Sequence, residues 1–532
     1  MRTKNRILGA LVAMLSVSVL CVPSVYAQVC SPKQHQTELQ YLRRLSLDLR
    51  GEMPSVKELK AVVEQGHVTE AMIDNMLSST GFVHQVREYH RNLLWPNVTN
   101  LTLSNGNWRF GGNGTSVPYY LTSLGRKQRY RGYNARCLNE PAKFDSNGNI
   151  TCKQETLKDR NGKPYTLCRE GYVKIKPYWA PDKEYKFCAY DAQQAESAKH
   201  TNGRTYNCGE STAPKGCGCG PNMRYCMTNT VQAQLTKDLG EQLLRFVQNI
   251  IDKKQPYTNV ITGKSLQING RLSHYLRYQT KAGGIFINKE QNYSVPALKY
   301  SEGTRWVETQ RKQLHAGVLT LPGFLLKFSA NRSRANRFYN AFLCKAFQAP
   351  SSGLPPASDR CHDEPNLMKR CGCKYCHQSV EPAAAYWGRW MESGLAPLNL
   401  DTYPTFDDVC AGSSGRNNSN CRRFYLVTPG HPDEDPYRGK LRAYLFATPE
   451  MAKNIEQGPI GIAQKSIDSG AFGQCAATNV WQWLMGHAPY SQQSNIITKL
   501  AEQFKNGKYS FSQLAKAVVM SPEYKQGRLL NQ

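Results

Sequence analysis

The stretch Cys373-Lys374-Tyr375-Cys376-His377 indicates that the fold of this chain must hold a covalently attached group. Two cysteines three positions apart lie on one turn of a helix, where their thiols can form thioethers with the two vinyl groups of one porphyrin. The histidine that follows can bind the iron from the same side. We therefore predict that Cys373 and Cys376 attach a haem c covalently and that His377 is an axial ligand of its iron.

The sequence leaves two other interpretations of the paired cysteines open. The pair could form a disulfide, or it could supply half of a zinc site beside an incidental histidine. Zinc would need a second ligand pair at similar spacing, which favours haem. The sequence contains no second Cys-x-x-Cys-His, so we expect one haem per chain.

The sequence defines the second axial ligand of the iron less well. A Met thioether would raise the reduction potential, a His would lower it, and an empty site would permit small-molecule chemistry. We predict Met451, which follows Thr448-Pro449 at an expected junction between a loop and a helix. The other candidates are Met391, whose tryptophan neighbours indicate packing, and His315, His362, His431 and His487.

The first 27 residues have the features of an export signal. Positive charges precede an apolar stretch at 8–20, which is too short for a membrane span, and a small-residue cleavage site ends at Ala27. We expect the mature chain to start at Gln28 and to lack a transmembrane span, because no later run approaches the roughly 18 apolar residues that a span needs. The signal and the haem motif together predict the periplasm, or the extracellular surface of the outer membrane, of a bacterium.

Export also accounts for the cysteine content. Of the 18 cysteines, one lies in the signal and two in the haem motif, so an odd number remains. We expect most of these to form disulfides in an oxidising compartment and at least one thiol to stay free or to pair between chains. Cys410 and Cys421 bracket a loop rich in Gly, Ser and Asn, which predicts that they pair with each other.

The net charge of +28 indicates anionic partners. An acidic redox protein and the anionic surface of the cell envelope both fit this charge. No nucleic-acid partner is expected, because the chain is exported and shows no nucleic-acid-binding motif. A basic surface that only keeps the protein in solution is the alternative interpretation.

Apolar periodicity predicts a mainly α fold. Together with the haem motif and the cysteine content, it indicates a multi-helix haem-bearing core and a disulfide-rich, loop-rich inserted module. The long stripe of Leu235, Leu239, Leu243 and Val247 is one example of helical spacing. The predicted divisions are a signal peptide (1–27), an N-terminal helical module (28–102), a Cys/Tyr-rich insert (103–226), a second helical module (227–348), a haem c module (349–435) and a C-terminal helical module (436–532).

The insert differs in composition from the rest of the chain. It holds eight cysteines and many Tyr, Gly, Asn and Lys residues without a sustained helical period, so disulfides are expected to hold it together. Its aromatic residues, such as Tyr119, Tyr178 and Trp179, alternate with Lys and Arg. These aromatics could bind a surface polymer, or they could form the small core of the module.

Several stretches, taken in order, resemble the planctomycete-type cytochrome-associated family of exported bacterial proteins. They are Arg43 to Gly51 followed by Pro54, Gln255-Pro256-Tyr257 with Asn269 to Leu272, Ala316 to Thr320 with Asn331 to Arg334, and Phe472 to Gly486 with Ala517 to Tyr524. Glu381-Pro382 after the haem motif is similar to that family's acidic-Pro pair. The resemblance implies an exported, mostly helical haem protein with no settled reaction, and it does not cover the insert.

Together these features predict an exported mono-haem c-type cytochrome that transfers electrons at the cell envelope or surface. Two alternatives stay open from the sequence. One is a haem oxidase or peroxidase with an open iron site, and the other is a surface polymer-binding or assembly protein that uses the insert. The sequence therefore leaves open whether the chain is an enzyme.

Overall fold

The computed structural model describes residues 36–526, with gaps at 99–108, 123–135, 210–213, 215, 280–293, 313, 348–352, 354, 357, 393, 396, 443–445 and 491–493. Helices account for about 48% of the structure and small strand pairs for 13%, so the prediction of a mainly α fold is confirmed. Within the described residues, no helix is both long and apolar enough to cross a membrane. The predicted export signal, 1–27, lies outside this part of the chain.

The described chain opens with four helices: α1 (Glu38–Arg50), α2 (Val56–Gln65), α3 (Glu70–Leu77) and α4 (Thr80–Leu94). Capping boxes start α1 at Thr37 and α2 at Ser55, where side-chain oxygens accept backbone N–H groups that the helix leaves unpaired. Gly51 ends α1 with a φ of 75°, a left-handed conformation that glycine adopts without strain.

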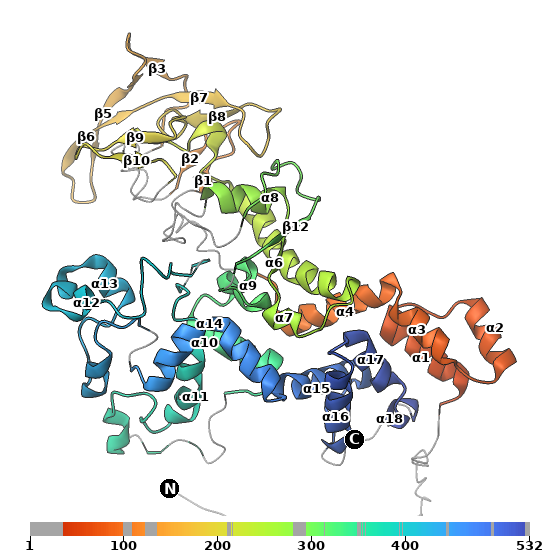
Figure 1. The fold of residues 1–532 in the computed structure, drawn as a ribbon. Coiled ribbons are helices and arrows are strands. Elements are labelled where there is room, and N and C mark those ends of the chain that lie inside the picture. The colour runs from red at the N-terminus through yellow and green to blue at the C-terminus, as the bar shows by residue number, and fades with distance from the viewer. Residues whose placement is uncertain are drawn as a thin grey trace, which may run out of the picture.

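Helix α6 (Asn229–Asp252) runs from the strand-rich insert into the helical part (Figure 1). Its predicted apolar stripe is buried. Arg87 of α4 forms an ion pair with Glu241 of α6 at 2.9 Å, which holds the two helices side by side. The elements that follow are α7 (Asn259–Thr262), β11 (Ser265–Ile268), α8 (Gly270–His274), the π-helical turn η2 (Tyr275–Gln279), β12 (Val307–Gln310), η4 (Gly317–Thr320), α9 (Pro322–Lys327) and α10 (Asn331–Phe342).

The closing helices are α14 (Pro449–Asp468), α15 (Ala471–Met485), α16 (Ser494–Asn506), α17 (Phe511–Val519) and α18 (Pro522–Lys525). They pack against the first helices. The Tyr524 hydroxyl donates to Asp48 Oδ2 at 2.7 Å, and the Arg44 guanidinium lies 3.8 Å from the centre of the Tyr524 ring. One large hydrophobic core therefore includes residues from α1 and α18.

The insert consists of short antiparallel strand pairs: β1 (Phe110–Gly111) with β2 (Tyr120–Leu121), β3 (Lys143–Phe144) with β4 (Ile150–Thr151), β5 (Lys153–Lys158) with β6 (Pro164–Arg169), β7 (Tyr172–Ile175) with β8 (Tyr185–Cys188), and β9 (Ser197–Lys199) with β10 (Thr205–Asn207). Four disulfides link them: Cys137–Cys188, Cys152–Cys168, Cys208–Cys217 and Cys219–Cys226. The module has its own small core, against which Tyr119 and Trp179 pack. This packing favours a structural role for these two aromatics.

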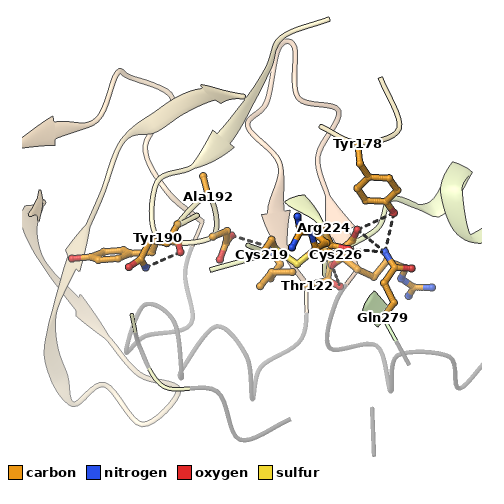
Figure 2. Close-up of a disulfide and its surroundings, with 12 residues drawn as sticks. Thr122, Tyr178, Tyr190, Ala192, Cys219, Arg224, Cys226 and Gln279 are labelled. Atoms are coloured by element: carbon orange, nitrogen blue, oxygen red, sulfur yellow. Dashed lines mark hydrogen bonds between the residues drawn. A yellow bond between two sulfur atoms is a disulfide. The ribbon is translucent and has the colours of Figure 1, made fainter. Parts of the chain in front are cut away.

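A buried contact near the Cys219–Cys226 disulfide joins the insert to the helical part (Figure 2). Gln279 Nε2, at the end of η2, donates to the Tyr178 hydroxyl at 2.9 Å and lies 3.3 Å from the carbonyl oxygens of Arg224 and Cys226. The Tyr178 hydroxyl in turn donates to the Cys226 carbonyl at 3.1 Å. The disulfide therefore holds the backbone that meets the helical part.

Two buried histidines should make the stability of this fold depend on pH. Burial lowers the pKa of His90 to about 4 and that of His274 to about 3, from an ordinary value of 6.5. Below about pH 6.5 the unfolded chain binds protons that the folded chain does not. The free energy of unfolding should thus fall from about pH 6.5 toward pH 4, by about 1.4 kcal/mol per pH unit for each histidine.

The matched variant is His90→Gln, because glutamine does not titrate and can still bond the Tyr257 hydroxyl, which lies 2.8 Å from His90 Nε2. Urea unfolding of this variant should show a shallower dependence of stability on pH than urea unfolding of the wild type. An unchanged slope would contradict the assignment to His90.

Candidate functional site

Helix α11 (Lys374–Ala385) carries the predicted attachment motif at its start. Cys373 is the residue that precedes the helix, and its carbonyl accepts the backbone N–H of Cys376 at 3.2 Å and that of His377 at 3.0 Å. This turn brings both cysteines and His377 together. Both thiols are free and partly buried, so the pair does not form a disulfide in the structure.

The other cysteines of the described part are all oxidised. Besides the four disulfides of the insert, the pairs are Cys344–Cys475, Cys361–Cys371 and Cys410–Cys421. The predicted pairing of Cys410 with Cys421 is confirmed. The odd cysteine expected in the mature chain is by elimination Cys30, which lies outside the described residues, so its state stays a prediction.

The donor set at α11 fits a haem c. Thioether formation needs reduced cysteines, and Cys373 and Cys376 are the two free thiols of the described part. Three groups of Cys, His or acidic residues elsewhere in the described residues bring ligand atoms within 4.8 Å of one another. Each of them contains a disulfide, which leaves too few ligands for zinc.

His377 is held by a carboxylate one turn further along α11. Its Nδ1 lies 2.5 Å from Glu381 Oε1, and Arg332 Nη2 lies 2.8 Å from the same oxygen. The Glu381 side chain is 1% exposed. Burial raises the pKa of Glu381, and the contacts with His377 and Arg332 act in the opposite direction. Since a carboxylate can only accept, Nδ1 carries the proton and Nε2 is left for a metal.

The start of α10 positions Arg332 firmly. Asn331 Nδ2 donates to the Trp387 carbonyl at 3.1 Å, and the Asn331 backbone N–H donates to Glu392 Oε1 at 2.9 Å.

The Arg334 guanidinium is fully buried, and burial lowers its pKa to about 9. It donates to the carbonyls of Phe328, Leu325, Trp390 and Met391. The segment that follows α11 is thereby fastened to α10.

Helix α14 also packs on α11, through a hydrogen bond from Asn454 Nδ2 to the Pro382 carbonyl at 2.8 Å (Figure 1). Met451 lies in the first turn of α14, after the N-cap Thr448, as its sequence context indicates. Its side chain is 0% exposed and belongs to a cluster that includes Ala385 and Ile455. Its role as second axial ligand stays a prediction.

Two further methionines, Met368 and Met391, pack against this cluster. Met368 could not be found from the sequence, because no motif marks it. The four histidine candidates lie in different surroundings: His315 against the Trp390 ring, His362 beside the Pro355 carbonyl, His431 at the start of η7 (Pro432–Tyr437), and His487 beside the Ala488 carbonyl.

Comparison of the chain with known protein families, curated proteins and solved structures gives no match. The resemblance to the planctomycete-type family therefore stays a prediction.

The Cys361–Cys371 disulfide ends two residues before Cys373. In Cys361→Ser, the freed Cys371 thiol should form a disulfide with Cys373 or Cys376 and so compete with haem attachment, with an oxidised disulfide carrier of the oxidising compartment accepting the two electrons. The ratio of haem absorbance to protein absorbance should then fall several-fold. The double variant Cys361→Ser/Cys371→Ser removes the competing thiol and should restore loading. Equal losses in both variants would contradict this competition.

Proposed function

We propose that this chain is an exported c-type cytochrome that carries one covalent haem and transfers electrons at the cell envelope or surface, as a member of the planctomycete-type cytochrome-associated family. One observation carries the proposal. Cys373 and Cys376 are free and precede His377 on one helical turn, whereas the other described cysteines are disulfide-bonded.

The chain's residues would bind and orient the group. The two thiols fix it to the start of α11, and His377 offers Nε2 because Glu381 holds Nδ1. The haem supplies one-electron chemistry when bound. The packing of α10 and α14 against α11 would keep His377 in one orientation.

Seven disulfides in the described residues indicate folding in an oxidising compartment. Within that constraint we propose the periplasm or the outer surface of a bacterial cell. The net charge of +28 favours an acidic redox partner or the anionic envelope surface, and association should weaken as salt increases.

Of the alternatives, a haem oxidase or peroxidase differs from the first proposal only in the second axial position. An open position there would favour the enzyme. The polymer-binding alternative has less support, because Tyr119 and Trp179 pack against the core of the insert and Tyr178 contacts the helical part.

Haem attachment should be covalent. Wild-type protein from a host with cytochrome maturation genes should keep its haem stain on a denaturing gel, because thioether bonds survive unfolding. Cys373→Ala/Cys376→Ala should lose the stain, and so should wild-type protein from a host without those genes. Haem-free wild-type protein from the competent host would refute the proposal.

The second axial ligand can be tested by substitution. If Met451 binds the iron, the ferric wild type should show the weak far-red band of His/Met ligation, and Met451→Ala should abolish it. Met391→Ala is the matched control, because Met391 packs against the same cluster, and this variant should keep the band. Ready carbon monoxide binding by the reduced wild type would instead indicate an open site and favour the enzyme.

A further inference from the structure

The contact of Arg332 with Glu381 goes beyond what haem attachment requires. Two thiols and a histidine imidazole are sufficient to attach and ligate the group. Here a third residue type, a carboxylate, contacts the non-ligating nitrogen of His377 at 2.5 Å. A guanidinium from a different helix then contacts that same carboxylate oxygen at 2.8 Å.

Glu381 is an unfavourable residue for this position on stability grounds alone. Its side chain is 1% exposed, and no donor among the described residues reaches its second oxygen, Oε2. Burying a carboxylate costs several kcal/mol unless its partners compensate fully, and an apolar side chain of similar volume would often be as stable. A buried acid beside a candidate iron ligand therefore indicates a role in the site.

The geometry defines what this acid does to His377. A carboxylate accepts the Nδ1–H, which fixes the tautomer and the plane of the ring. It also increases the electron density that the ring can donate through Nε2, because the proton is drawn toward the acid. Arg332 supplies a permanent positive charge that stabilises the ionised carboxylate at this buried position.

We infer that Glu381, positioned by Arg332, is a tuning residue that lowers the reduction potential of the haem iron through His377. The inference rests on the proposed haem attachment and deepens it. A more strongly donating imidazole stabilises ferric over ferrous iron, since the oxidised metal carries more positive charge. The chain would accordingly serve as an electron donor to partners of higher potential.

The test is the midpoint potential of the haem-loaded full chain and of Glu381→Gln, measured by spectroelectrochemical titration. Glutamine keeps the size of the side chain and can accept the Nδ1–H but carries no charge. Mutation of such a histidine partner typically changes metal affinity or activity by roughly tenfold or more. Glu381→Gln should shift the relative stability of the two oxidation states toward ferrous iron by about tenfold. Such a shift raises the potential by about 59 mV.

The matched control is Glu392→Gln. It removes a charge at the start of α10, but glutamine can still accept the Asn331 backbone N–H, so the contact that positions Arg332 is kept and no contact with His377 is changed. Its potential should stay at the wild-type value. Equal shifts in the two variants, or no shift in Glu381→Gln, would overturn the inference and leave the proposed haem attachment intact. A wild type without covalent haem would overturn both.

A measurement on the wild type covers the case in which Glu381→Gln does not retain haem. The hyperfine-shifted proton NMR signal of the His377 Nδ1–H should persist after transfer to D2O, because that proton is bonded to a buried carboxylate. Immediate exchange would show that Nδ1 faces solvent and would overturn the inference.

Discussion

The ion pair between Arg332 and the buried Glu381 carboxylate is the interaction on which the candidate site depends. A carboxylate at 1% exposure needs a counter-charge, and Arg332 supplies it across the interface of α10 and α11. The first turn of α10 is itself fixed by Arg334, which bonds carbonyls on both sides of the interface. The contacts that pack α10 against α11 therefore also orient the His377 imidazole. The orientation of this ring and the stability of the helix packing are linked.

The short stretches that resemble a known family make the same kind of contact elsewhere in the fold. Asp48 near the end of α1 accepts from Tyr524 of α18, and Tyr257 bonds His90 of α4. Each contact joins segments far apart in the sequence. The Asp48–Tyr524 pair joins two of these stretches, whereas His90, the partner of Tyr257, lies outside them.

Local signals explain how much of the fold could be predicted from the sequence. Apolar spacing acts within a few residues, so the N-terminal helical module and the buried stripe of α6 were predicted together with the helical turn at Cys373. The strands of the insert were not, because they are two to six residues long and disulfides link them. The contact of Arg332 with Glu381 could not be predicted from the sequence either, because no local pattern around either residue encodes it.

The most direct test of this account is the intact mass of the purified wild-type protein under denaturing conditions, combined with alkylation of free thiols. The account predicts the mature polypeptide plus one haem, with Cys373 and Cys376 protected from alkylation because both are thioethers. A polypeptide without haem whose Cys373 and Cys376 are both alkylated, or are joined in a disulfide, would contradict it.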